Sequence, residues 1–282
     1  MNRNKLSLKL IHEATKTLHG WFSKTPIEYS KPLSDILKVP VIFKCEHLQP
    51  SGSLHLRGAY FLLSKLSDIE KKQGIITSCQ GSKAVAIAYA SHLLNIPCKL
   101  YLPLNTDSII ERKLIEFQAE FYLTDSYSEL DQSSWLCLEN HPLLMAASGG
   151  SLAVEIFKDI PQVKNIIAPI NQGNMMTGLT YYAKKKYPDI TLIGCQNTDL
   201  IGSDKSSVIL KNKPDHLSLH CSEELIEGVR WMLHHHQCLI DPSAAVTIAA
   251  CLHEKRPHLE GPTAVILSSR HIDTDKLKEL LI

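Results

Sequence analysis

The segment Ser51-Gly52-Ser53-Leu54-His55-Leu56-Arg57-Gly58-Ala59 decides how the rest of this chain is interpreted. It connects an expected strand, residues 40–44, to an expected helix, residues 56–66. Serine and glycine are turn residues, and the apolar run that follows them favours a helix. The segment therefore predicts a strand–turn–helix unit that carries a histidine beside the start of its helix.

Outward from this unit, short apolar runs alternate with segments of helical periodicity almost to the end of the chain. Strands are expected at residues 74–78, 98–102, 120–123, 165–169, 191–195 and 263–268. Helices are expected at residues 4–19, 83–93, 108–117, 126–138, 152–160, 175–186, 223–235 and 244–253, and a surface loop at 199–219. Such alternation predicts an α/β fold with parallel sheets flanked by helices.

Composition excludes several classes of function. The 282 residues are 44% hydrophobic and 21% charged, with a net charge of +1. That balance is typical of a globular protein and argues against a surface for nucleic acid or anionic membranes. No apolar run approaches the roughly 20 residues that span a bilayer. The polar N-terminus has no apolar signal core, so we expect a cytoplasmic protein without membrane or nucleic-acid partners.

Cysteine and histidine spacing predicts no metal site. No two of the eight cysteines form a C-x-x-C pair, and most lie in apolar stretches, so we expect buried free thiols. His234-His235-His236 follows Trp231 in an expected helix, where consecutive side chains point in different directions. We interpret this run as positive charge at a helix C-terminus rather than as a set of metal ligands.

Three motifs together resemble one enzyme family. They are Thr25-Pro26-Ile27-Glu28-Tyr29-Ser30, Lys44-Cys45-Glu46-His47-Leu48-Gln49-Pro50 and the segment 51–59. They are similar to T-P-L-x-x-S, K-x-E-x-x-Q-P and S/T-G-S-F-K-x-R-G-A of the serine/threonine dehydratase family, which also contains serine racemases. These are pyridoxal-phosphate-dependent enzymes of fold type II, and the resemblance covers nearly the whole chain.

The resemblance implies a two-lobed, tryptophan synthase beta-like architecture. Residues 1–73 and 144–282 would form the larger cofactor lobe, and residues 74–143 the smaller, mobile one. Pyridoxal phosphate is the implied cofactor, and a homodimer the implied assembly. The family glutamate that binds a divalent metal in some members is Gln196 here, so no oxygen-ligand metal site is expected.

The catalytic positions that the resemblance assigns are altered. His55 stands where the family has the lysine that forms an imine with the cofactor. Imidazole contains no primary amine, so His55 could serve only as a weak base. The family segment S-S-G-N-H corresponds to 79–83, which places Gln80 at the opposite-face serine and Ser82 at the asparagine that contacts the cofactor ring. Lys83 adds an amine that could act as a substitute.

The cofactor-binding positions are also mostly altered. The family's glycine-rich phosphate loop corresponds to 169–175, which keeps one glycine; the equivalent positions are Asn171, Gln172, Gly173 and Asn174. Asparagine tolerates left-handed backbone conformations, so the shape of the loop is expected to persist. Ser268 keeps the serine that bonds the pyridine nitrogen, and Asp241 is expected near a helix N-cap.

Three hypotheses follow from this pattern. The first is a catalytically degenerate homologue, a pseudoenzyme that binds a partner or a small amino-acid or anionic ligand in the old cleft. The second is an active serine/threonine ammonia-lyase that uses Lys83, or Lys44, as the amine. The third is a regulatory subunit that pairs with an intact paralogue.

Overall fold

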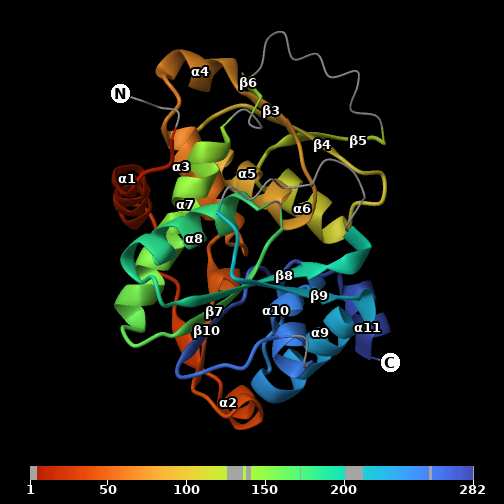
Figure 1. Ribbon diagram of the computed structural model, residues 1–282. Coiled ribbons are helices and arrows are strands. Elements are labelled where there is room, and N and C mark those ends of the chain that lie inside the picture. Colours follow the sequence, from red (N-terminus) through yellow and green to blue (C-terminus); the bar gives the residue numbers. More distant parts are fainter. Residues whose placement is uncertain are drawn as a thin grey trace.

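The protein folds into two β-sheets with flanking helices, and all strand pairs except β1–β2 are parallel (Figure 1). The computed structural model describes residues 5–125, 136–137, 141–171, 173–200, 212–253 and 256–281. The larger sheet has six strands in the order β1-β2-β10-β7-β8-β9, and the smaller has four in the order β5-β4-β3-β6. We call the elements from β3 to β6 the small lobe and the larger sheet with its helices the large lobe. The predicted α/β class is confirmed, whereas the predicted domain boundaries stay a prediction.

The large-lobe sheet is parallel except at one edge. Its strands are β1 (Ile27–Tyr29), β2 (Val41–Lys44), β7 (Asn165–Pro169), β8 (Thr191–Asn197), β9 (His216–His220) and β10 (Thr263–Ile266). Only β1 runs antiparallel, and it pairs with β2. The register of β10 against β2 and β7 aligns Thr263 with Val41 and Asn165. The carboxyl ends of β10 and β7 therefore meet at the same edge, where Ser268 and the loop after Pro169 lie.

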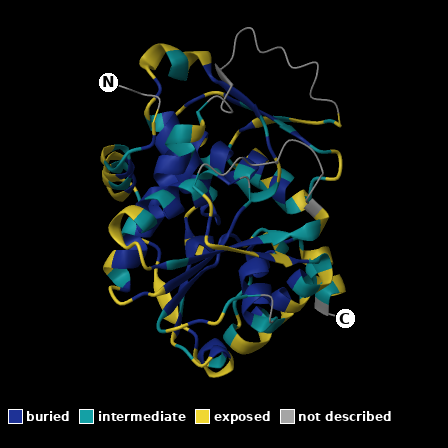
Figure 2. Ribbon diagram, viewed as in Figure 1, coloured by how far each residue is buried: buried dark blue, intermediate teal, exposed yellow. Residues whose placement is uncertain are grey.

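Helices cover both faces of this sheet, because neighbouring strand residues alternate between two hydrophobic cores. Ile166 and Ala264 pack with α1 (Leu8–His19), α7 (Pro142–Asp159) and α8 (Asn174–Lys186). Ile167 and Val265 pack with α2 (Lys31–Leu37), α9 (Ser222–His236) and α10 (Pro242–Leu252). Figure 2 shows the buried strands at the centre and the exposed outer faces of the helices. This alternation is what a fully buried parallel sheet requires.

The small lobe packs against α3 (His55–Ser64). Its elements are β3 (Ile75–Ser78), α5 (Gly81–Leu93), β4 (Cys98–Leu102), α6 (Ser108–Glu116), β5 (Glu120–Leu123) and β6 (Leu136–Cys137). Most buried residues of α3 belong to the small-lobe core, whereas Phe61 belongs to the large-lobe core. The helix that begins with His55 therefore lies between the two lobes. The remaining helices are α4 (Asp68–Gln73) and α11 (Thr274–Leu281).

Close helix contact fixes the position of the loop before α8. A Cβ atom on Gly178 of α8 would lie 1.5 Å from the carbonyl oxygen of Ala146 in α7, and one on Gly149 would lie 2.0 Å from that of Met175. Only glycine allows the two backbones to approach this closely. The first turn of α8 is therefore held against α7.

Some of the predicted elements need correction. The helix expected at 126–138 is wrong at residues 136–137, which form β6 beside β3; the remainder lies outside the described residues. The loop expected at 199–219 is wrong at its end, because residues 216–220 add the edge strand β9 to β8. The helix expected at 152–160 begins at Pro142 instead. In the part of the chain that the structure describes, no helix has the length and apolarity to cross a membrane.

Candidate functional site

A buried ionic network is centred on Arg57, in the first turn of α3. The Arg57 guanidinium donates to both carboxylate oxygens of Glu46, at 2.7 and 2.8 Å, and to both oxygens of Glu155, at 2.7 and 2.8 Å. Thr25 and Gln49 also donate to Glu46. The adjacent guanidinium lowers the pKa of both carboxyls, although burial alone would raise it. The polar residues of the three sequence motifs thus meet in one structural network.

Lys44 belongs to the same network and lies outside the cleft. Its side chain is fully buried, and its ammonium donates to the Thr25 carbonyl at 2.8 Å. It also forms ion pairs with Glu155 at 2.9 Å and with Asp159 at 3.4 Å. A charged, paired ammonium has no lone pair for attack on an aldehyde. The hypothesis that Lys44 replaces the missing amine is therefore not supported by its surroundings.

His55 occupies the first position of α3 and faces a different environment from Arg57. Its backbone N–H donates to the Ser53 hydroxyl at 3.2 Å, and the N–H of Leu54 donates to the Ser268 carbonyl at 2.8 Å. Burial, together with the positive charge of Lys83, lowers the pKa of His55 to about 4. The imidazole is therefore neutral near pH 7.

Lys83 and Ser82 reach the same place from α5 in the small lobe. The positive charge of Lys83 contributes to the lowered pKa of His55, and the role expected of Lys83 as a substitute amine stays a prediction. Ser82 donates to the Asp241 carboxylate at 3.1 Å and lies 2.9 Å from Nδ1 of His271. Gln80, in contrast, is exposed just before α5 and caps it with no side-chain hydrogen bond. The structure thus joins Ser82 to Asp241 and His271, and leaves Gln80 exposed before α5.

Asp241 connects three segments: the start of α10, residues 269–271 and the start of α5. Its Oδ1 accepts from the backbone N–H of Ala244 and from the hydroxyls of Ser243 and Ser269, at 2.6 to 3.0 Å. Its Oδ2 accepts from Ser82 and from the backbone N–H of His271, both at 3.1 Å. The predicted N-cap role is confirmed, because Asp241 is the N-cap residue of α10. With five donors on two oxygens, the carboxylate is fully satisfied.

The loop before α8 keeps the backbone shape that its sequence predicted. Asn171 and Gly173 have φ angles of 49° and 79°, both in the left-handed region. Gly173 is the N-cap of α8 and supplies no side-chain cap, so first-turn N–H groups of α8 lack a capping side chain. Asn174 is the first residue of that helix and is partly buried. Gln172 lies outside the described residues.

Ser268 carries an unpaired polar atom beside this loop. The residue is 1% exposed, and its hydroxyl has no hydrogen-bond partner among the described residues. Because β10 pairs in parallel with β7, Ser268 lies at the sheet edge that leads into the loop. A buried hydroxyl without a partner costs free energy, which is often the mark of a ligand position.

Comparison with known proteins gives this arrangement its family. The model of the family described as "Pyridoxal-phosphate dependent enzyme" matches residues 19–269. The chain belongs to this pyridoxal-phosphate-dependent enzyme family. It is 26% identical to the L-threonine ammonia-lyase of Geobacter sulfurreducens over 95% of this chain and 76% of that protein. It is 23% identical to the serine racemase of Dictyostelium discoideum over 98% of both chains.

Solved structures show the same fold for this member of the pyridoxal-phosphate-dependent enzyme family. Maize serine racemase superposes with a TM-score of 0.85 at 19% identity, covering 98% of this chain and 97% of that one. Processed threonine deaminase isoform 2 of Solanum lycopersicum gives 0.81 at 20% identity, covering 99% and 90%. The predicted family and its fold type II architecture are therefore confirmed.

The residues of this family member fit the implied cofactor only in part. The family implies pyridoxal phosphate, and the unpaired Ser268 hydroxyl and the uncapped start of α8 suit a ring nitrogen and an anion. The amine that would hold the aldehyde is absent, because position 55 is a neutral imidazole. The site does not fit a cofactor bound as an imine at that position.

Sequence reasoning missed one functional candidate of this family member. The His271 side chain packs against Gly52: a Cβ atom added to that glycine would lie 2.9 Å from Nε2 of the imidazole. Burial lowers the pKa of His271, and the nearby Asp241 carboxylate opposes the shift. Arg270 beside it is exposed. No local pattern marks His271, because its partners lie 30 and 189 residues away.

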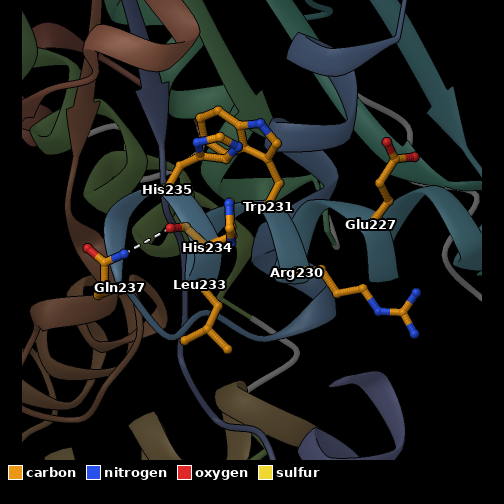
Figure 3. A pocket seen from close by; sticks show the side chains of 7 residues that line it. All are labelled: Glu227, Arg230, Trp231, Leu233, His234, His235 and Gln237. Atoms are coloured by element: carbon orange, nitrogen blue, oxygen red, sulfur yellow. Dashed lines mark hydrogen bonds between the residues drawn. The ribbon is translucent and has the colours of Figure 1, made fainter. Parts of the chain in front are cut away.

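A separate hollow of about 630 Å³ lies on the outer surface of α9 (Figure 3). Its lining includes Trp231, His234 and His235, with the Trp231 and His235 ring centroids 4.6 Å apart. His236 instead lies 2.9 Å from both Ser30 and Glu28. His236 thus points away from the hollow that His234 and His235 both line.

Proposed function

We propose that this chain is a non-catalytic member of the pyridoxal-phosphate-dependent enzyme family that binds a small amino-acid or anionic ligand in the cleft beside His55. The observation that carries the proposal is the neutral imidazole at the position of the family amine. Lys44, the lysine of the motif at residues 44–50, is fully buried and ion-paired, so it does not replace the missing amine. Without a covalently held electron sink, the family reaction loses its means of stabilising a carbanion.

Unpaired polar groups support a ligand role for the cleft. The Ser268 hydroxyl lacks a hydrogen-bond partner among the described residues, and the segment that carries it is joined to that of the neutral His55 by the bond from Leu54 to Ser268. The uncapped N-terminus of α8 follows the neighbouring strand β7 and favours negative charge. A small ligand with a carboxylate and a further polar group would satisfy these atoms.

Lys83 supports a second candidate function, an active serine/threonine ammonia-lyase. Its positive charge contributes to the lowered pKa of His55, which supports a primary amine close to the position of the missing one. The proximity favours the idea, but an imine also demands an accurate angle and distance to the aldehyde. The two candidates predict different chemistry for the same side chain.

Turnover separates the two candidates. Wild type, Lys83→Ala and the control Lys113→Ala, which removes another small-lobe amine, are incubated with pyridoxal phosphate and L-threonine or L-serine, and ammonia is measured. The proposal predicts no release above the protein-free blank for any of them. Release by the wild type and the control, abolished in Lys83→Ala, would replace the proposal with the second candidate.

Ligand binding is tested by thermal unfolding with single amino acids and small carboxylates. A ligand that binds only the folded state stabilises it by about 2.7 kcal/mol at a concentration of 100 Kd. We expect a rise in Tm for the wild type with at least one such compound, and a smaller rise for Ser268→Ala. A panel without any shift would contradict a ligand-binding cleft.

A further inference from the structure

Two sets of side-chain contacts connect the small lobe to the large lobe, an inner set at Ser82 and an outer set at the start of α6. The inner contacts join Ser82 of α5 to Asp241 and His271 of the large lobe, at 3.1 and 2.9 Å. The outer contacts start two residues after His271. There, Asp273 accepts from Ser108 of α6 and lies 3.8 Å from Arg112. Apart from Asp241, the large-lobe residues that make these inner and outer contacts lie between residues 271 and 276.

The outer contacts also include a charged pair. Lys276 of α11 forms an ion pair with Asp107, the N-cap residue of α6. The hydrogen bond from Ser108 lowers the pKa of Asp273, so that its carboxylate stays ionised. The Lys276 and Arg112 side chains are 58% and 62% exposed, and their partners Asp107 and Asp273 are 29% and 14% exposed. Ion pairs with one solvent-exposed partner remain open to screening by salt, so we expect them to break without unfolding the protein.

We propose that residues 271–276 form an interlobe latch, in which Asp273 and Lys276 hold α6 of the small lobe against the large lobe over the cleft. Release of these two side chains lets the small lobe move away, and the inner contacts of Ser82 then separate. The role of the latch in admitting a ligand rests on the proposed function. Its control of the distance between the lobes does not, and can be measured on the protein alone.

The geometry favours a switch between two positions over gradual bending. The partners Asp273 and Lys276 are only three positions apart in the chain. They face three residues at the start of α6: its N-cap Asp107, Ser108 and Arg112. Loss of one pair therefore weakens its neighbour, because both share the same short segment. The inner contact of Ser82 lies on α5 of the same lobe and must follow any movement of α6, which packs against α5.

The test measures the distance between the lobes by pulsed electron spin resonance. Spin labels are attached through non-canonical residues at Ile36 of α2 and Ile115 of α6, which are 47% and 65% exposed, so that the native thiols are not used. The wild type should give one main distance at low salt. Asp273→Asn combined with Lys276→Ala should add a longer population, and about 1 M salt should do the same to the wild type because screening shortens to roughly 3 Å.

Lys278→Ala is the matched control. Lys278 belongs to the same helix as Lys276 but pairs with Asp275 within its own segment, at 2.9 Å. Its removal should leave the distance distribution unchanged. An unchanged distribution in the Asp273→Asn, Lys276→Ala variant, with native circular dichroism, would overturn the latch.

A charge exchange keeps the test decisive if that variant folds poorly. Lys276→Asp alone should lengthen the distance, because it places two carboxylates together. Adding Asp107→Lys should restore the wild-type distribution. A longer population that persists in the exchanged pair would also overturn the proposal, since the attraction would then not be what holds the lobes.

Discussion

Arg57 and Glu155 form a bidentate ion pair, with Nη1 2.7 Å from Oε1 and Nη2 2.8 Å from Oε2. Arg57 lies two residues after His55 and is buried in the ionic network, whereas His55 begins the helix between the two lobes. The same helical turn therefore carries a structural residue and a site residue. This separation explains how the chemistry of position 55 can change while the fold around Arg57 persists.

Replacement of Arg57 should be strongly destabilising. Arg57→Ala leaves Glu46 and Glu155 buried without their main cation, and breaking a buried pair in this way typically costs about 3–5 kcal/mol. The free energy of unfolding in urea measures the loss. Lys31→Ala is the control, because its pair with Asp35 is exposed and should contribute no more than about 1 kcal/mol. A loss of similar size in both variants would contradict the structural role of the network.

Two buried histidines should make the protein sensitive to acid. Burial lowers the pKa of His47 and His55 from 6.5 to about 4, so the unfolded chain binds more protons between these values. Stability is therefore retained above pH 6.5 and lost as the pH falls toward 4. For His47, which is 3% exposed, the loss is about 3 kcal/mol, at about 1.4 kcal/mol per pKa unit.

The measurement compares the pH dependence of urea unfolding in the wild type, His47→Gln and His55→Gln. Each variant should lose less stability than the wild type between pH 6.5 and 4, because one proton-binding difference is gone. Nuclear magnetic resonance of the imidazoles should show both wild-type rings titrating well below pH 6. Identical pH slopes for all three proteins would rule out this origin of acid sensitivity.

The α7–α8 contact should tolerate no side chain at its centre. Gly178→Ala would place Cβ 1.5 Å from the Ala146 carbonyl oxygen, so the helices must move apart and the start of α8 must shift. Overpacking typically costs about 1–3 kcal/mol, and a contact with rigid backbone should reach the upper end of that range. Gly20→Ala is the control, since its Cβ would lie 3.4 Å from the nearest atom. Calorimetry of both variants should show a lower Tm for Gly178→Ala alone.

Ser82 and Asp241 should be energetically coupled across the cleft. Ser82→Ala and Asp241→Asn each remove the contact of 3.1 Å, so the double variant should lose less stability than the sum of the single ones. Contacting residues typically show coupling of about 0.5–3 kcal/mol. Strictly additive losses in urea unfolding would show that the two lobes do not interact through this pair.

Much of the fold could be predicted from local sequence, because buried parallel strands and their helices have strong apolar patterns. β4 and β5 begin and end where their periodicity predicted, and α5 and α9 differ by one or two residues. β9 was missed because its pattern is mixed: Leu217 and Leu219 are exposed, whereas Ser218 and His220 are buried. Position 217 would be polar in an ordinary half-buried strand.

The candidate site was assigned at positions that the family motifs mark, and its long-range contacts were missed. His55, Lys83 and Ser268 were assigned because their segments resemble those motifs. The bonds from Ser82 to Asp241 and His271 span 159 and 189 residues, so no local pattern could reveal them. Likewise, nothing in the sequence indicated that Lys44 would be fully buried in an ion network.

Reduction of a cofactor adduct tests most directly whether the site around His55 forms an imine with the aldehyde of pyridoxal phosphate. Wild type and Lys83→Ala are incubated with pyridoxal phosphate, reduced with borohydride and measured by intact mass, and adducts are located by peptide mapping. The account predicts no site-specific adduct in either protein. A single adduct that maps to Lys83 in the wild type and is absent from the variant would contradict it.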